Sequence, residues 1–77
     1  MPFLHKPERE EIERLAQQLT PRLVQVLEGR EISEDDAASL LSGVLIRLMY
    51  RWNSIPDREH WVLSTFEAQL RRYLERC

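Results

Sequence analysis

Apolar residues recur at helical spacing in three stretches of the chain, residues 7–28, 33–53 and 57–75. The stretch 33–53 is the most apolar and the longest without interruption, so we expect it to be the central helix. The connection 53–56 is short, which predicts that helices 33–53 and 57–75 form an antiparallel hairpin. The pattern therefore predicts an all-α three-helix module.

The first stretch contains a proline, Pro21, in the middle of its apolar pattern. Pro21 falls on the polar side of the helical wheel, and the apolar residues before and after it keep the same phase. We therefore predict one helix over 7–28, kinked at Pro21, that starts at Pro7 and is ended by Gly29. The alternative is two helices, with Thr20 as the N-cap of the second. The apolar residues are Ile12, Leu15, Ala16, Leu19, Leu23, Val24, Val26 and Leu27.

The second stretch opens with a strong helix start, because Ser33 is a good N-cap and acidic residues follow it. Its main apolar arc covers about half of the wheel and is wide enough to contact both other helices. A second pattern lies on the far side, at the spacing of one seam along a helix. That seam predicts a further helix contact, most simply with a second copy around a two-fold axis, whereas the alternative is that it faces water. The arc comprises Ala37, Ala38, Leu40, Leu41, Val44, Leu45, Leu48, Met49 and Trp52, and the seam comprises Ser39, Gly43, Ile46 and Tyr50.

The third stretch follows Pro56, with Ser54 or Asp57 as the N-cap. Trp61 lies off its apolar arc, so we expect it to be either a lid over the hairpin end near Trp52 or part of an interface. The predicted interface is therefore Ser39, Gly43, Ile46, Tyr50 and Trp61. The residues predicted to be buried on this helix are Val62, Leu63, Phe66, Leu70, Tyr73 and Leu74.

The chain has 77 residues, which predicts a single helical domain over 1–77 with a flexible or docking N-terminal arm at 1–6. A domain of this size buries little apolar surface and is only marginally stable alone. Its only cysteine, Cys77, allows no internal disulfide and favours a reducing compartment. Oligomerisation is the remaining source of buried area, so we expect a homodimeric bundle.

Charge is uneven although the net charge is only −2: residues 1–46 carry nine acidic and five basic residues, and residues 47–77 carry four and six. This mild dipole suits association with a protein partner better than uniform binding to nucleic acid. No segment has the apolar length of a signal peptide or a membrane span, so we expect no membrane association and a cytoplasmic location.

Residue types that carry chemistry are few. His5, His60 and Cys77 do not stand at metal-ligand or catalytic spacing, and Gly29 and Gly43, the only glycines, form no phosphate-binding loop. We therefore predict no enzyme, no catalytic residues, no metal and no cofactor. The best case for nucleic acid is the arginines of helix 57–75, but the chain is acidic and glutamates lie among them, which favours a solvated face. The residues concerned are Arg71, Arg72 and Arg76, with Glu67 and Glu75.

Several residues together resemble the YejL-like family of small bacterial proteins. They are a Val-Leu-Glu run at 26–28, Gly43 within a helix, Pro56 before a helix, and Phe66 and Leu70 one turn apart. The resemblance covers about residues 12–75 and implies an all-helical homodimer with no catalytic residues. The first helix is longer here and contains Pro21, which departs from the family pattern.

We expect the protein to be a non-enzymatic interaction module that acts as a small helical homodimer. The alternative is a helical adaptor or inhibitor that docks on a different protein through Trp61, Ile46 and Tyr50. A further alternative is a nucleic-acid accessory protein that uses the arginines of helix 57–75.

Overall fold

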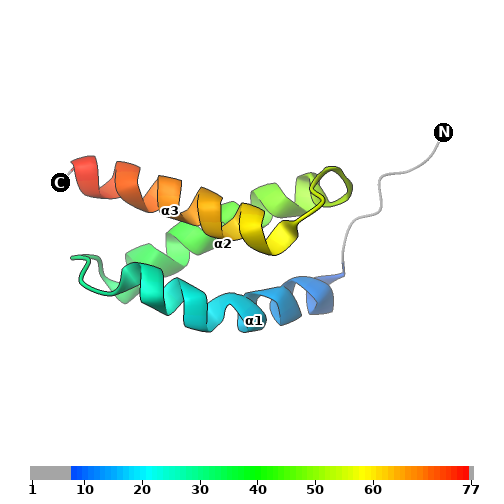
Figure 1. The fold of residues 1–77 in the computed structure, drawn as a ribbon, viewed down its shortest axis with the longest axis horizontal. Coiled ribbons are helices and arrows are strands. Elements are labelled where there is room, and N and C mark those ends of the chain that lie inside the picture. The colour runs from blue at the N-terminus through cyan, green and yellow to red at the C-terminus, as the bar shows by residue number, and fades with distance from the viewer. Residues whose placement is uncertain (1–7, 77) are drawn as a thin grey trace.

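The computed structural model describes residues 8–76, and over that range the chain forms three α-helices and one 3-10 turn, with no strand. Helices that follow one another in the chain run in opposite directions (Figure 1). The all-α, three-helix prediction is confirmed, while the expectations about the arm at 1–6, Pro7 and Cys77 lie outside the described residues. The elements are α1 (Arg9–Leu27), α2 (Glu34–Tyr50), η1 (Trp52–Ser54) and α3 (Arg58–Arg76).

Helix α1 runs through Pro21 as one element, so the two-helix alternative is wrong. Pro21 is exposed, which keeps the apolar stripe of α1 unbroken on the opposite side. The hydroxyl of Thr20 donates to the carbonyl of Ala16 at 2.8 Å, one turn earlier. The helix ends where predicted, because Gly29 has a φ of 75°, a conformation that glycine adopts without strain.

Helix α2 starts as predicted but ends early. The hydroxyl of Ser33 accepts the N–H of Asp36 at 3.2 Å and so caps the helix. The helix ends at Tyr50 instead of reaching Asn53, and Trp52 lies in η1 instead of on the helical arc. The tight turn buries both Trp52 and Ile55, at 9% and 8% exposure, so burial of the connection prevails over continuation of the helix.

Helix α3 is capped by Asp57, whose Oδ1 accepts the N–H of His60 at 3.1 Å. It packs against both α1 and α2, so α3 occupies the central position that was predicted for residues 33–53. This correction has a physical reason. The apolar residues of α3 lie on one face, whereas α2 is more apolar on average but less amphipathic, and it spreads its apolar residues over two faces.

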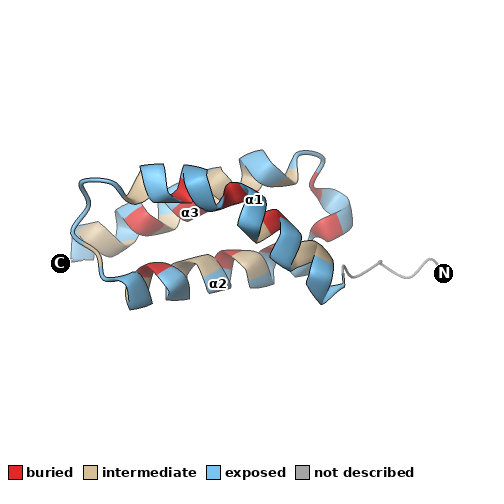
Figure 2. Ribbon diagram, turned by 90° about the horizontal axis from the view of Figure 1, so that it is seen from below, coloured by how far each residue is buried: buried red, intermediate tan, exposed pale blue. Residues whose placement is uncertain are grey.

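The core lies between the three helices and is almost entirely aliphatic and aromatic (Figure 2). Phe66, Leu48 and Val62 are 1%, 0% and 0% exposed, and full burial of such side chains stabilises a fold by about 1.5–3 kcal/mol each. Of the residues predicted for α3, Leu63, Tyr73 and Leu74 are only half-buried. The core cluster comprises Leu15, Leu19, Leu23, Val44, Leu48, Trp52, Ile55, Val62, Phe66 and Leu70.

Within the described part of the chain, no helix combines the length and the apolar character needed to cross a membrane.

The exposed proline in α1 makes a stability test. Pro21→Ala should raise the free energy of unfolding by about 2 kcal/mol. Proline in a helix interior costs about 3 kcal/mol relative to alanine. The unfolded alanine variant is more flexible than the parent, and this reduces the gain in stability by about 0.4–1 kcal/mol. Urea denaturation followed by circular dichroism measures the change. Gln25→Ala, at another exposed position of α1, is the control and should change stability by less than about 0.5 kcal/mol. A less stable Pro21→Ala protein would contradict this account of α1.

Candidate functional site

The outer face of α2, defined by Ser39, Gly43, Ile46 and Tyr50, points away from the core. All four residues are exposed, and the two large side chains, Ile46 and Tyr50, are 54% and 71% exposed. Exposed apolar residues are ordinary when scattered singly, but here they share one side of one helix. The outer face is therefore the first candidate for an interaction surface.

The core sets the orientation of this face. Val44 and Leu48 are 1% and 0% exposed, which fixes the rotation of α2 about its axis. Residues at a spacing of two lie on opposite sides of a helix, so Ile46 must point outward when Val44 and Leu48 point inward. Met49 lies at the margin of this face and is 36% exposed.

Gly43 meets nothing on its open side within one copy of the chain. A Cβ atom placed on Gly43 would have no neighbour within 4 Å, so packing within one copy does not require glycine there. Glycine in a helix interior costs about 1 kcal/mol relative to alanine. Gly43 also lines a shallow depression of about 110 Å³ between α2 and α3, together with Ser39, Leu40, Val44, Arg47 and Gln69.

Trp61, the fifth predicted interface residue, comes from α3. Its side chain is half-buried and packs against the core cluster, which suits the role of a lid. The structure thus brings four of the predicted residues together on α2 and places Trp61 partly within the packing of the hairpin.

An apolar groove between α1 and α2 was not predicted from the sequence. It has a volume of about 180 Å³. Val24, at its edge, is 55% exposed although its position on the wheel predicts burial. The helical wheel could not reveal the groove, because a wheel does not show that α1 packs mainly against α3. The lining residues are Thr20, Leu23, Val24, Leu27, Ala37, Ala38, Leu41 and Phe66.

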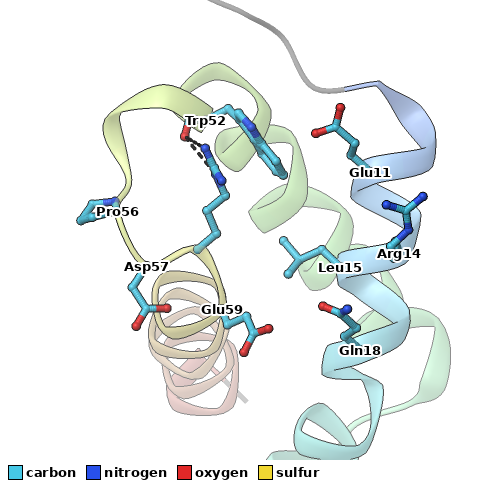
Figure 3. A pocket seen from close by; sticks show the side chains of 9 residues that line it. Glu11, Arg14, Leu15, Gln18, Trp52, Pro56, Asp57 and Glu59 are labelled. Atoms are coloured by element: carbon cyan, nitrogen blue, oxygen red, sulfur yellow. Dashed lines mark hydrogen bonds between the residues drawn. The ribbon is translucent and has the colours of Figure 1, made fainter.

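A larger, polar cleft of about 530 Å³ lies between α1 and the turn before α3 (Figure 3). Its lining carries both acidic and basic side chains but no histidine, cysteine, serine or threonine. Asp57 already caps α3 through its carboxylate. The lining residues are Glu11, Arg14, Leu15, Gln18, Trp52, Pro56, Asp57, Arg58 and Glu59.

Arg58 in this cleft has a structural role. Its guanidinium lies over the ring of Trp52, with the Cζ atom 4.0 Å from the ring centroid. Its Nε and Nη2 atoms both donate to the main-chain carbonyl of Trp52, at 3.1 and 3.0 Å (Figure 3). Stacking and a forked hydrogen bond together make Arg58 the clamp of the hairpin turn.

The arginines considered for nucleic acid lie on the exposed side of α3. Arg71, Arg72 and Arg76 are exposed, and the Nη2 atom of Arg71 lies 4.0 Å from Oε1 of Glu67. His60 is exposed, with Nε2 3.4 Å from the hydroxyl of Ser64. Among residues 8–76 no three metal-ligating side chains gather into a group.

No family model, curated protein or solved structure matches this chain. The resemblance to the YejL-like family therefore stays a prediction from sequence pattern.

The clamp on the hairpin turn can be tested by substitution. Arg58→Ala should lower the free energy of unfolding by about 1–3 kcal/mol, because it removes hydrogen bonds from a charged donor and the contact with the Trp52 ring. Arg58→Lys should lose part of that amount, since an ammonium group lacks the planar fork. Urea denaturation measures both variants.

The matched control is Arg72→Ala, because Arg72 is an exposed arginine on the same helix. It should change stability by less than about 0.5 kcal/mol. If Arg58→Ala behaved like the control, the clamp would have no part in holding the turn.

Proposed function

We propose that the protein is a non-enzymatic interaction module that works as a homodimer through the outer face of α2. The observation that carries the proposal is the exposure of Ile46 and Tyr50, at 54% and 71%, on the most apolar of the three helices. The core of a single copy does not account for apolar side chains at these positions, and an interface accounts for them directly.

The energetic balance supports association between copies. A two-fold interface buries each contributing side chain twice, and each large apolar side chain contributes up to about 1.5–3 kcal/mol. Ile46, Tyr50 and Met49 from two copies supply an amount of the same order as the cost of association, about 4–15 kcal/mol. We therefore expect a reversible dimer.

Family resemblance and chain length point in the same direction. The pattern shared with the YejL-like family implies an all-helical homodimer. In addition, a chain of 77 residues buries a modest core, and a second copy is a direct way to remove more apolar surface from water.

A helical adaptor that binds a different protein is the second candidate, and the groove between α1 and α2 favours it. The groove is lined mostly by apolar side chains, and Val24 at its edge is 55% exposed. Grooves of this kind accept the apolar face of an amphipathic helix. The homodimer is preferred because Ile46 and Tyr50 lie outside this groove.

A role with nucleic acid is the weakest candidate. Arg71, Arg72 and Arg76 are exposed, but Arg71 lies within 4.0 Å of Glu67 and the net charge of the chain is −2. A role with nucleic acid would require that the protein bind DNA or RNA with an affinity that falls steeply as the salt concentration rises.

The homodimer predicts a particle mass that depends on concentration. Sedimentation across a dilution series should give twice the chain mass at high concentration and the chain mass at low concentration. Ile46→Arg should shift this transition to much higher concentration, because it places charge within an apolar contact. Gly43→Leu should do the same by keeping the two backbones apart.

Both variants should keep the helix content of the parent, because Ile46 is exposed and the open side of Gly43 is empty. Gln17→Arg, at an exposed position of α1, adds the same charge elsewhere and should leave the transition unchanged. A parent chain that sediments as a folded monomer at all concentrations would overturn the homodimer. A stoichiometric partner lost on Val24→Glu would instead favour the adaptor.

A further inference from the structure

Charge along α2 is opposite at its two ends. Beside the outer face, its first turn carries Asp35 and Asp36 and its last turn carries Arg47, whereas Glu34 and Arg51 lie toward other sides of the helix. Between these ends, the outer face carries the exposed apolar side chains and the small residues Ser39 and Gly43. When two copies of such a helix pair, the acidic end of one meets the basic end of the other only if the two helices run in opposite directions.

The outer face lies on the side of α2 away from the core, and all four of its residues are exposed. Figure 2 shows α2 along one side of the molecule, with α3 and the C-terminal half of α1 along the other. A helix laid along the outer face would therefore meet α2 first, with Gln69 of α3 at the edge of the depression beside Gly43. Because Gly43 has no neighbour on its open side, the backbone of such a helix could approach closely there.

We propose that two copies of the chain pair through α2 in antiparallel orientation, with the two-fold axis beside Gly43. Ser39 of one copy then lies beside Ile46 of the other, so that a small and a large side chain share each layer. The acidic first turn of one copy lies beside the basic end of the other. This inference rests on the proposed homodimer and adds to it the orientation and register.

Parallel pairing would place like charges together at both ends. Exposed ion pairs contribute little energy, about 0–1 kcal/mol each, so the charges decide orientation more than affinity. The macrodipoles of two neighbouring helices also favour opposite directions. The apolar residues supply the attraction in either orientation, and the electrostatics select the antiparallel one.

Cysteine crosslinking distinguishes the two orientations. In a Cys77→Ser background, Gly43→Cys should form a disulfide with itself, because its two copies flank the axis. Ser39→Cys and Ile46→Cys should each fail to crosslink alone, since like positions lie about 10 Å apart along the axis. A mixture of the two proteins should give a disulfide between residues 39 and 46.

Parallel pairing also predicts a Gly43→Cys disulfide, but it differs in that Ser39→Cys and Ile46→Cys each crosslink to themselves and their mixture gives no 39–46 disulfide. Gln25→Cys, on the exposed side of α1, is the control and should not crosslink. The mixed 39–46 disulfide remains informative even if Gly43→Cys disturbs the close approach at the axis. Dimers by sedimentation without the 39–46 disulfide would overturn this register while leaving the homodimer in place. Monomers throughout would overturn both.

Charge reversal gives a second test by a different principle. Asp35→Arg and Arg47→Asp should each raise the dimer dissociation constant about tenfold, because an exposed ion pair contributes about threefold and a two-fold dimer contains the pair twice. The double variant should return close to the parent value, because reversing both charges restores the attraction. Single and double variants with additive effects would contradict the proposed contact between the two ends.

Discussion

The structure depends on the way the hairpin of α2 and α3 is fastened at both ends. At the turn, Arg58 stacks on Trp52 and donates two hydrogen bonds to its carbonyl. At the open end, the hydroxyl of Tyr73 donates a hydrogen bond to the carboxylate of Asp36. Because the two fastenings lie at opposite ends of the pair, they limit both sliding and rotation of α2 on α3.

This constraint fixes which face of each helix is buried. With α2 held in one rotation, Val44 and Leu48 fill the space against α3, and Ile46 and Tyr50 are left outside. Helix α1 then packs on α3, which becomes the helix shared by both contacts. The apolar groove between α1 and α2 follows from this arrangement, since these two helices contact each other less than either contacts α3. Both candidate surfaces are therefore consequences of how α3 is packed.

Local sequence signals predicted most of the fold because each acts through neighbouring residues. Ser33, Gly29 and Asp57 end or begin helices through their own hydrogen bonds or dihedral angles, and the structure shows each of them in that role. Pro21 kept its helix because it lies on the exposed side, which the wheel had indicated. Such features need no knowledge of the rest of the chain.

The features that sequence reasoning missed depend on residues far apart in the chain. Trp52 and Ile55 become buried because they join the core cluster with residues of α1 and α3, an outcome of tertiary packing and not of helix propensity. The bond between Tyr73 and Asp36 joins residues 37 positions apart, so no local pattern predicts it. Mean hydropathy also misplaced the central helix, because it counts apolar residues without regard to the side on which they lie.

Interactions within α2 and contacts between copies also contribute differently, the first to the fold of one copy and the second to the proposed association. Acidic residues at the start of α2 and basic residues at its end stabilise that helix by complementing its own dipole, whether or not it has a partner. The arrangement nevertheless makes the helix surface complementary to its own reversed copy. Ile46 and Tyr50 differ from these charges because they contribute little to the core of a single chain. Substitutions at these two positions are therefore expected to change the proposed association without a change in fold, whereas the proposed orientation of the pair depends on charges that also stabilise the helix itself.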